Sequence, residues 1–438
     1  MTTTVQGAGK PHPAQQAKDI GAPDGQARPS VFDIFLDPAT MADPYPLYRR
    51  LLAERPVQAD EGLPVVLTRY NDVRAALTDP QLSTDDRHDT MLAAMKGSGG
   101  LPPALVSMLD RRSFLHRDPP EHSRLRRQAR DALTPRRIGA ARQAAQVAAD
   151  ELLDAAARGG SLELIADYAY PLPLTIISGL LGLPLDSDRE LPWWRSQMCA
   201  DFEAPAVAGE DCAGYSYQAQ VQMIARFDEL IAAKRQAPAD DVATDLIAAE
   251  GRGELSAAEV NDICRLLLVA AHETTTTLIA NGVLALLRNE AQLRLLRTRP
   301  LLTASAVDEA ARYDPPIQFT RRIAVADADV NGVPVSAGRM VLAWIGAANR
   351  DPDRFVSPDE FNIRRLPKEH LAFGAGFHAC LGGSLACALS EAAYAAFSSR
   401  LVGAELAAGQ PVYLPNAVHA VEALQVTFQD IRPTGTAA

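Results

Sequence analysis

One cysteine in this chain lies in a setting that suits metal chemistry. Residues 373–382 read Phe-Gly-Ala-Gly-Phe-His-Ala-Cys-Leu-Gly, which places Cys380 in a glycine-flanked turn before a helix-like run, Gly383 to Leu401. Glycine lets the backbone pass close to a flat cofactor. The dipole and free N–H groups of the following helix would stabilise a thiolate. Such a thiolate can be an axial ligand of haem iron, where it favours O–O cleavage.

Three other interpretations of this segment must be weighed. Most lone cysteines are buried and inert. Residues 374–379 fit the loose dinucleotide-binding pattern, but that site needs a second strand, and an Ala-rich helical run follows instead. His378 and Cys380 supply only two of the ligands that a zinc site needs. We therefore favour thiolate ligation of haem.

A long apolar helix contains a second candidate group. Residues 266–275 read Leu-Leu-Leu-Val-Ala-Ala-His-Glu-Thr-Thr. Glu273 followed by Thr274 is unexpected there, because a buried carboxylate costs free energy and threonine is stiff in a helix. A helix with one wet face would explain the pair. An acid beside an alcohol could also deliver the protons that heterolytic O–O cleavage needs.

Basic residues after Pro119 and Pro120 form a third candidate group. Proline suits the first turn of a helix, so we expect a helix here with His122 and Arg126, four residues apart, on one side. Ten arginines lie between positions 111 and 142, and a solvated basic face is the ordinary explanation. Arginine also binds carboxylates through paired, charge-assisted hydrogen bonds.

The cysteine segment resembles the haem-binding loop of the cytochrome P-450 family, and four further motifs follow that family's order from about Asp118 to the C-terminus. One is Glu309-Ala-Ala-Arg312, which alone could be a surface ion pair. In the family this motif belongs to a buried charge network on the proximal side of the haem. The resemblance implies Arg354 as the third member of that network.

The resemblance also implies a role for each remaining site residue. Cys380 would be the axial ligand of the iron, Thr274 would hydrogen-bond the bound dioxygen, and Glu273 would relay protons. His122, Arg126, Arg322 and His378 would hold the haem propionates, and Phe373, Gly374, Gly382 and Ala270 would contact the cofactor, haem b (iron protoporphyrin IX). If the match to the family's motif is shifted by one residue, Arg321 would hold the propionate in place of Arg322. The family usually has glycine where Ala271 stands, so we expect its methyl group to narrow the space over the iron.

The overall composition fits a large helical protein. The chain has 438 residues, of which 47% are hydrophobic and 22% charged, and its net charge of −11 argues against nucleic-acid binding. Five cysteines do not make a disulfide framework and indicate a reducing cytoplasm. No apolar run approaches the ~18 residues of a membrane span, so we expect no membrane attachment. Residues 1–30 are predicted to be a disordered tail, and residues 31–438 a single haem-thiolate domain.

The residue patterns also predict individual elements. We expect a mainly α protein with small sheets around a buried haem, the cytochrome P-450 fold, rather than a doubly wound one. Residues 121–300 read as mostly helical, with an interruption over 201–219, and 83–116 read as a long loop. Strand-like runs are Val65–Leu67, Arg322–Val330, Val333–Val335, Met340–Trp344 and Leu424–Phe428.

The expected function is a haem-thiolate monooxygenase that hydroxylates or epoxidises a mostly apolar small molecule with O2, in secondary-metabolite (antibiotic) biosynthesis. No flavin fingerprint or iron–sulfur cysteines are present, so ferredoxin and ferredoxin reductase would be separate electron donors to a monomeric enzyme. The resemblance to the cytochrome P-450 family implies that the substrate pocket draws on residues 91–115, 193–217, 269–270, 317–319 and 416–418, most of them apolar. The alternatives are an oxidase of the same fold that closes rings or couples groups without inserting oxygen, a non-catalytic haem-binding protein, and an NAD-dependent dehydrogenase.

Overall fold

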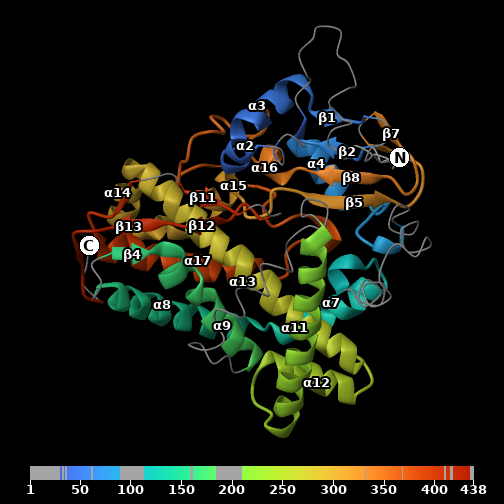
Figure 1. Cartoon of the computed structure of the whole chain (residues 1–438), viewed down its shortest axis with the longest axis horizontal. Coiled ribbons are helices and arrows are strands. Elements are labelled where there is room, and N and C mark those ends of the chain that lie inside the picture. The colour runs from blue at the N-terminus through green and yellow to red at the C-terminus, as the bar shows by residue number, and fades with distance from the viewer. Residues whose placement is uncertain are drawn as a thin grey trace, which may run out of the picture.

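The protein is mainly helical, with small sheets beside a stack of helices (Figure 1). The computed structural model describes residues 30–31, 34, 37–60, 63–88, 113–157, 161–183, 210–330, 332–366, 368–408, 411–414 and 418–434. The predicted class, mainly α with small sheets and without a doubly wound sheet in these ranges, is confirmed. The predicted tail lies outside the described residues, apart from Ser30.

The helices supply most of the packed mass. They are α2 (Pro38–Ala42), α3 (Tyr45–Glu54), α4 (Tyr70–Thr78), α7 (Glu121–Ala132), α8 (Pro135–Ala157), α9 (Pro171–Leu181), α11 (Glu210–Gln236), α12 (Val242–Gly251), α13 (Ala257–Arg288), α14 (Glu290–Thr298), α15 (Thr303–Tyr313), α16 (Ile345–Ala348) and α17 (Gly383–Arg400). Short 3-10 turns are η2 (Asp86–His88), η3 (Phe114–His116), η5 (Pro300–Leu302) and η6 (Gly376–His378), and η4 (Ile165–Ala169) is a π-helical turn.

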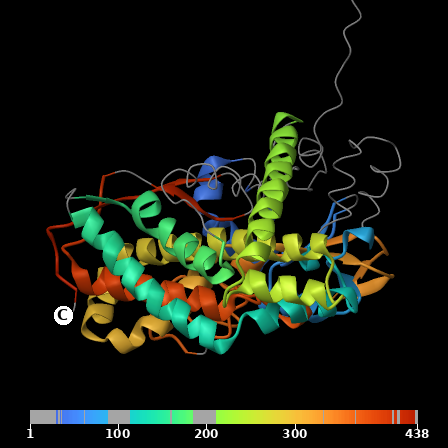
Figure 2. The same cartoon turned by 90° about the horizontal axis from the view of Figure 1, so that it is seen from below.

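Helix α13 runs through the middle of the molecule and packs against α9, α11, α12, α15 and α17 (Figures 1 and 2). A capping box starts it, in which the Ser256 hydroxyl accepts from the Glu259 backbone N–H and the Glu259 carboxylate accepts from that of Ser256. Among the residues described, α13 is the one helix long and apolar enough to cross a membrane. However, 67% of its apolar stretch is buried inside the protein, as expected of a core helix.

Helices α13 and α17 are joined at one close contact. The Tyr394 hydroxyl of α17 donates a hydrogen bond of 2.6 Å to the backbone carbonyl of Leu278 in α13. At Gly282, one turn further along α13, a Cβ atom would lie 1.6 Å from the same hydroxyl oxygen. Only glycine therefore lets the two helices approach this closely without displacement of Tyr394.

The largest sheet has the strand order β1-β2-β8-β5-β3, and in it β2 and β8 run parallel while the other pairs are antiparallel. Its strands are β1 (Val57–Gln58), β2 (Val65–Leu67), β3 (Leu82–Ser83), β5 (Thr320–Ala324) and β8 (Met340–Ala343). The remaining strands form small sheets: β4 (Ser161–Glu163), β6 (Ala328–Val330), β7 (Val333–Val335), β9 (Leu401–Val402), β10 (Glu405–Leu406), β11 (Val412–Tyr413), β12 (Val421–Ala423), β13 (Gln425–Thr427) and β14 (Asp430–Ile431).

Several sequence-based boundaries need correction. The interruption predicted over 201–219 is wrong from Glu210 onward, because α11 begins there. The single run predicted over Arg322–Val330 is two strands, β5 and β6. Strand β4 lies inside the stretch predicted to be helical and pairs with the C-terminal strand β13. Of the predicted long loop over 83–116, residues 89–112 lie outside the described ranges.

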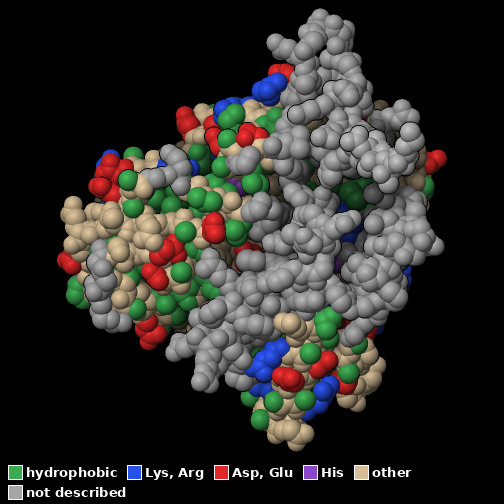
Figure 3. All heavy atoms as spheres, in the orientation of Figure 1, with side chains coloured by type: hydrophobic (Ala, Val, Ile, Leu, Met, Phe, Trp, Pro, Cys, Tyr) green, Lys and Arg blue, Asp and Glu red, His purple; other side chains and the backbone are tan. Residues whose placement is uncertain are grey.

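The surface view shows no face of one charge over α11 and α12. Basic and acidic side chains are interspersed there (Figure 3), and they include the ion pairs Arg235–Glu250 and Arg252–Glu254. The predicted arginine-rich segment is also largely paired with acids, as in Arg136–Asp240 and Arg142–Glu391. Mixed charges of this kind favour solubility over nucleic-acid binding.

Candidate functional site

The Cys380 loop has the backbone that its glycines allow. Gly374 and Gly376 have φ values of +67° and +70°, in the left-handed region that favours glycine. A Cβ atom at Gly376 would also lie 2.8 Å from the carbonyl oxygen of Leu77 in α4. The Cys380 backbone N–H donates to the Phe373 carbonyl at 2.8 Å, which closes the loop. Gly382 has an ordinary φ of −86° and caps the N-terminus of α17.

The Cys380 thiol retains exposed surface although protein atoms surround most of it. Burial raises the pKa of this thiol, and three neighbours oppose that effect. The backbone N–H of Gly382, the guanidinium of Arg126 and the backbone N–H of Gly383 each lower the pKa, although the net shift is still upward. The same three groups would stabilise a thiolate that binds a metal ion, because the two N–H groups donate to the sulfur and the guanidinium supplies a nearby positive charge.

Four basic side chains from three segments gather beside the Cys380 loop. His122 and Arg126 come from α7, Arg322 from β5, and His378 from η6. The rings of His122 and His378 lie 4.2 Å apart between centroids. Arg126 donates to the carbonyl of Ala379 at 2.6 Å, beside Cys380. The four residues that the sequence predicted as a propionate-binding set are therefore brought to one place, which we call the basic cluster.

The basic cluster is electrostatically unsatisfied among the described residues. His122 is 2% exposed, and neither of its ring nitrogens has a hydrogen-bond partner there. Arg322 is 3% exposed and bonds only to Thr320 and a backbone carbonyl, and burial lowers its pKa to about 10. Burial, followed by the neighbouring His122, Arg322 and Arg126, lowers the pKa of His378 to about 3. Carboxylates placed here would relieve each of these costs.

The chemistry of these donors fits a haem. A haem needs one axial ligand and partners for its two propionate groups, and Cys380 and the basic cluster are suited to these tasks. Within the described ranges, no group of three or more His, Cys, Asp or Glu side chains could hold a metal ion by itself.

Residues Glu273 and Thr274 lie in the middle of α13. Glu273 is 5% exposed, and Thr274 is half-buried. The Thr274 hydroxyl donates to the carbonyl of Ala270 at 2.6 Å. Its proton is therefore engaged within the helix, while its oxygen keeps lone pairs that can accept a hydrogen bond. In this part of α13 the half-buried positions, which include Ala270, Ala271 and Thr274, follow helical spacing along one side.

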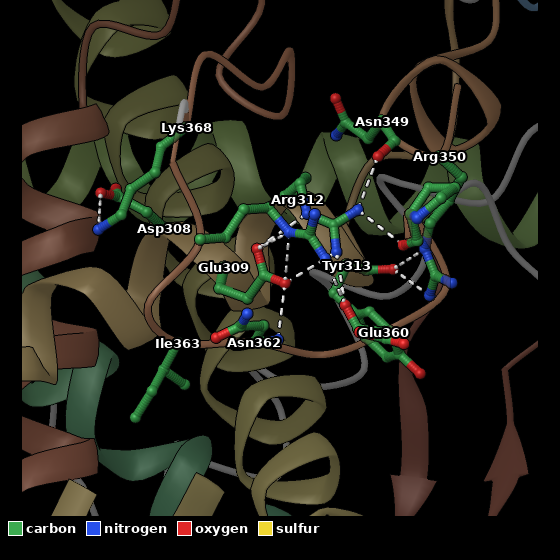
Figure 4. Close-up of polar contacts among 12 residues, drawn as sticks. Asp308, Glu309, Arg312, Tyr313, Asn349, Arg350, Glu360, Asn362, Ile363 and Lys368 are labelled. Carbon is green, nitrogen blue, oxygen red and sulfur yellow. Dashed lines mark hydrogen bonds and ion pairs between the residues drawn. The ribbon is translucent and has the colours of Figure 1, made fainter. Parts of the chain in front are cut away.

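The Glu-x-x-Arg motif forms a buried charge network, but its third member differs from the prediction (Figure 4). Arg312 donates to both carboxylate oxygens of Glu309 at 2.8 Å. The third member is Arg365, whose Nε lies 3.0 and 3.1 Å from the two Glu309 oxygens. The prediction of Arg354 was wrong, because that side chain pairs with the exposed carboxylate of Glu369.

Two site residues were not found by sequence reasoning. Thr84 follows β3, and its hydroxyl lies 3.0 Å from Nε2 of His378. Arg365 lies in the pair Arg364-Arg365, which has no distinctive spacing from the Glu-x-x-Arg motif. Neither residue carries a local sequence signal, because each is brought into place by chain segments far from its partner.

Comparisons with known proteins agree on one family. The family model described as "Cytochrome P450" matches residues 290–393. The cytochrome P450 monooxygenase PikC of Streptomyces venezuelae is 34% identical, with 93% of this chain and 97% of that protein covered. The mycinamicin IV hydroxylase/epoxidase of Micromonospora griseorubida is 37% identical, with 80% and 85% covered. The crystal structure of P450BioI bound to an acyl carrier protein superposes with a TM-score of 0.80 at 32% identity, with 90% of this chain and 99% of that one covered.

The fold and these similarities define the class of protein, a haem-thiolate oxygenase. The chain belongs to the cytochrome P450 family and is an oxidoreductase of the monooxygenase type. Membership implies a haem-thiolate cofactor. It also implies electron delivery by redox partners, as is general for bacterial members.

Proposed function

We propose that this protein binds haem b through the Cys380 thiolate and uses O2 to hydroxylate or epoxidise a mostly apolar small molecule. One observation carries the proposal: Cys380, the only described cysteine in a glycine turn, lies beside the basic cluster, where the backbone N–H groups of Gly382 and Gly383 and the nearby charge of Arg126 favour its thiolate. The bound haem would supply O2 activation and one-electron chemistry, which no side chain provides.

The basic cluster would hold the two propionates. Neutral His122 and His378 can each donate one hydrogen bond from a ring N–H. Arg126 and Arg322 can each donate two parallel hydrogen bonds to one carboxylate. Arg322 is buried and no direct ion pair holds it among the described residues, where the more distant Asp118 is the carboxylate that favours its charged form; a propionate would therefore supply a directly bonded counter-charge. Phe373, Gly374, Gly382 and Ala270 would contact the porphyrin, Phe373 and Gly374 from the loop and Ala270 from α13.

Thr274 and Glu273 would manage protons over the distal side of the cofactor. The Thr274 oxygen, whose own proton is held by the Ala270 carbonyl, would accept a hydrogen bond from the pocket side. Glu273 would hold a proton on its carboxylate one position earlier in the helix. Glu273 would then be the general acid that supplies the proton, and the Thr274 oxygen would orient the group that receives it.

The substrate and its biological setting rest on similarity. PikC and the mycinamicin IV hydroxylase/epoxidase support a role in secondary-metabolite (antibiotic) biosynthesis. In the structure, Ile317 pairs with Val418 in an isolated bridge, which joins two of the expected pocket segments. The other expected pocket segments, 91–115 and 193–217, lie largely outside the described residues.

We further propose a monomeric haem domain over residues 31–438, with ferredoxin and ferredoxin reductase as separate electron donors. The described cysteines, Cys264, Cys380 and Cys387, are free thiols, which supports a reducing cytoplasmic setting.

A carbon-monoxide difference spectrum of the reduced protein tests the proposal. The parent protein should show the red-shifted band of a thiolate–CO complex, and Cys380→His should lose it while retaining haem. Cys387→Ala is the matched control, because Cys387 lies in α17 seven residues on and should leave the band unchanged. A Cys380→Ala variant that kept the band would refute the assignment. Incorporation of one ¹⁸O atom from ¹⁸O2 into a product would then separate oxygen insertion from coupling.

A further inference from the structure

A small cavity lies on the side of α13 that faces η4 and the C-terminal strands. Its volume is about 20 Å³, and its lining includes Glu273. The other lining residues come from η4 and its end, from α13 and from the hairpin region: Ile165, Tyr170, Thr276, Thr277, Ala280, Leu414, Ala420 and Val421. A space of roughly 10–15 Å³ on this measure is enough for one water molecule if polar partners are present.

The α13 residues that line the cavity form one stripe. Glu273, Thr276, Thr277 and Ala280 are spaced by three, four and seven positions, so they share a side of the helix. Thr274 lies about 100° around the helix from Glu273, and its hydroxyl is bonded to Ala270. The acid therefore faces the cavity, whereas the neighbouring alcohol faces the half-buried side.

Two hydroxyl groups in this stripe are buried and have no hydrogen-bond partner among the described residues. Thr276 is 5% exposed and Thr277 is 2% exposed, and neither hydroxyl oxygen has a hydrogen-bond partner in the described part of the chain. A helical threonine commonly bonds back to the carbonyl four residues earlier, as Thr274 does. Two such threonines lining one water-sized cavity indicate a polar ligand in that cavity, since buried polar groups are almost always satisfied.

We propose that this cavity is a water-binding site built by Thr276 and Thr277 for Glu273. One water molecule can bond to both hydroxyls and donate to the Glu273 carboxylate, because water has two donors and two acceptor sites. Thr276 and Thr277 are then positioning residues, which fix the carboxylate through the water and do not touch the reacting atoms. The proposal rests on the proton-handling role of Glu273 in the proposed function.

Isosteric substitutions separate this role from packing. In Thr276→Val/Thr277→Val, both hydroxyls are lost while the branched shape is kept. In Thr276→Ser/Thr277→Ser, both hydroxyls are kept while the methyl groups are lost. Thr275→Val is the matched control, because Thr275 is 1% exposed in the same helix and does not line the cavity. The melting temperature of the valine pair should change little, because valine keeps the packing of the threonines and only water-mediated hydrogen bonds are lost.

The first measurement is a high-resolution crystal structure of the holoprotein and of each variant. We expect an ordered water between the two hydroxyls and Glu273 in the parent, the serine pair and Thr275→Val, and no water in the valine pair. A dry cavity in the parent would overturn the site. This readout needs no turnover, so it decides the proposal even if the monooxygenase assignment fails.

The second measurement is the ratio of hydrogen peroxide to product during turnover of 7-ethoxycoumarin as a probe substrate. The valine pair should release several-fold more peroxide per product than the parent, and the serine pair should restore the parent ratio. Haem content and the thiolate–CO band should be the same in all variants. An unchanged ratio in the valine pair, with the water absent from its structure, would overturn the positioning role.

Discussion

Replacement of Arg365 by alanine should destabilise the protein far more than replacement of Arg354. Arg365 is 8% exposed and Glu309 is 1% exposed, so their ion pair is shielded from water. Arg365 also donates to the backbone carbonyls of Ser357 and Glu360 at 3.0 and 2.8 Å. The Arg354 side chain is 28% exposed, and its partner Glu369 is 78% exposed.

The burial of each ion pair determines how much stability its loss should cost. Removal of one partner of a buried ion pair costs about 3–5 kcal/mol, because the remaining charge stays buried. Glu309 keeps the two hydrogen bonds from Arg312 and one from the Asn362 backbone N–H, which places Arg365→Ala near the lower limit, about 3 kcal/mol. An exposed pair contributes about 0–1 kcal/mol, so Arg354→Ala should cost no more than that.

Urea unfolding followed by far-UV circular dichroism measures both effects in one series. The parent, Arg365→Ala and Arg354→Ala should give similar m-values, because the surface exposed on unfolding is nearly the same. The midpoint should fall clearly for Arg365→Ala alone. Equal destabilisation by the two substitutions, or a larger effect at Arg354, would refute the assignment of Arg365 to the network.

Three further predictions concern histidines and the basic cluster. His122→Ala/Arg126→Ala should speed haem transfer to apomyoglobin, because each charged hydrogen bond contributes about 1.5–3 kcal/mol; an unchanged transfer rate would contradict the placement of the propionates. Burial lowers the pKa of His370 to about 4, so the unfolded state binds more protons than the native state below pH ~6.5, and native stability falls between that pH and 4. His370→Gln should reduce the loss of unfolding free energy between pH 7 and pH 5. An equal loss of unfolding free energy in the parent and the variant would count against this role of His370. Burial opposes protonation of His419, but Asp314, whose carboxylate lies 2.8 Å away, outweighs it and raises the pKa of His419. His419→Gln should therefore cost more stability below pH ~6.5 than at a pH above the raised native pKa, and equal costs at pH 6 and 9 would show that the charge on the histidine is not involved.

Motifs with short-range spacing were predictable from sequence. The start of α17 after Cys380 and the strands Val65–Leu67 and Val333–Val335 are where the residue patterns place them. His122 and Arg126 were placed on one helical side by their spacing, and the structure puts both against the Cys380 loop, at His378 and Ala379. In these cases a local pattern carries the information, because helix and strand periods act over a few residues.

Features that depend on distant segments were not predictable in the same way. The choice of Arg365 over Arg354 is made by the path of the chain between them, in which three backbone carbonyls converge on the Arg365 guanidinium. The cavity beside Glu273 requires η4 and the C-terminal strands, whose lining residues are more than 100 positions from Glu273 in the sequence. Strand β4 was missed because its partner, β13, lies at the other end of the chain.

The contact between Gly282 and Tyr394 limits how this protein can diversify. It joins the helix that carries Glu273 and Thr274 to the helix that follows Cys380, so the spacing between these two helices is fixed by one hydroxyl and one absent side chain. A larger residue at position 282 would displace the Tyr394 ring and break its hydrogen bond to Leu278, or push the helices apart, and either change would disturb the contact between the two helices that carry these groups. In a directed-evolution library, variants with new substrate ranges should therefore keep Gly282 and Tyr394 unchanged and accumulate their substitutions in segments outside α13 and α17.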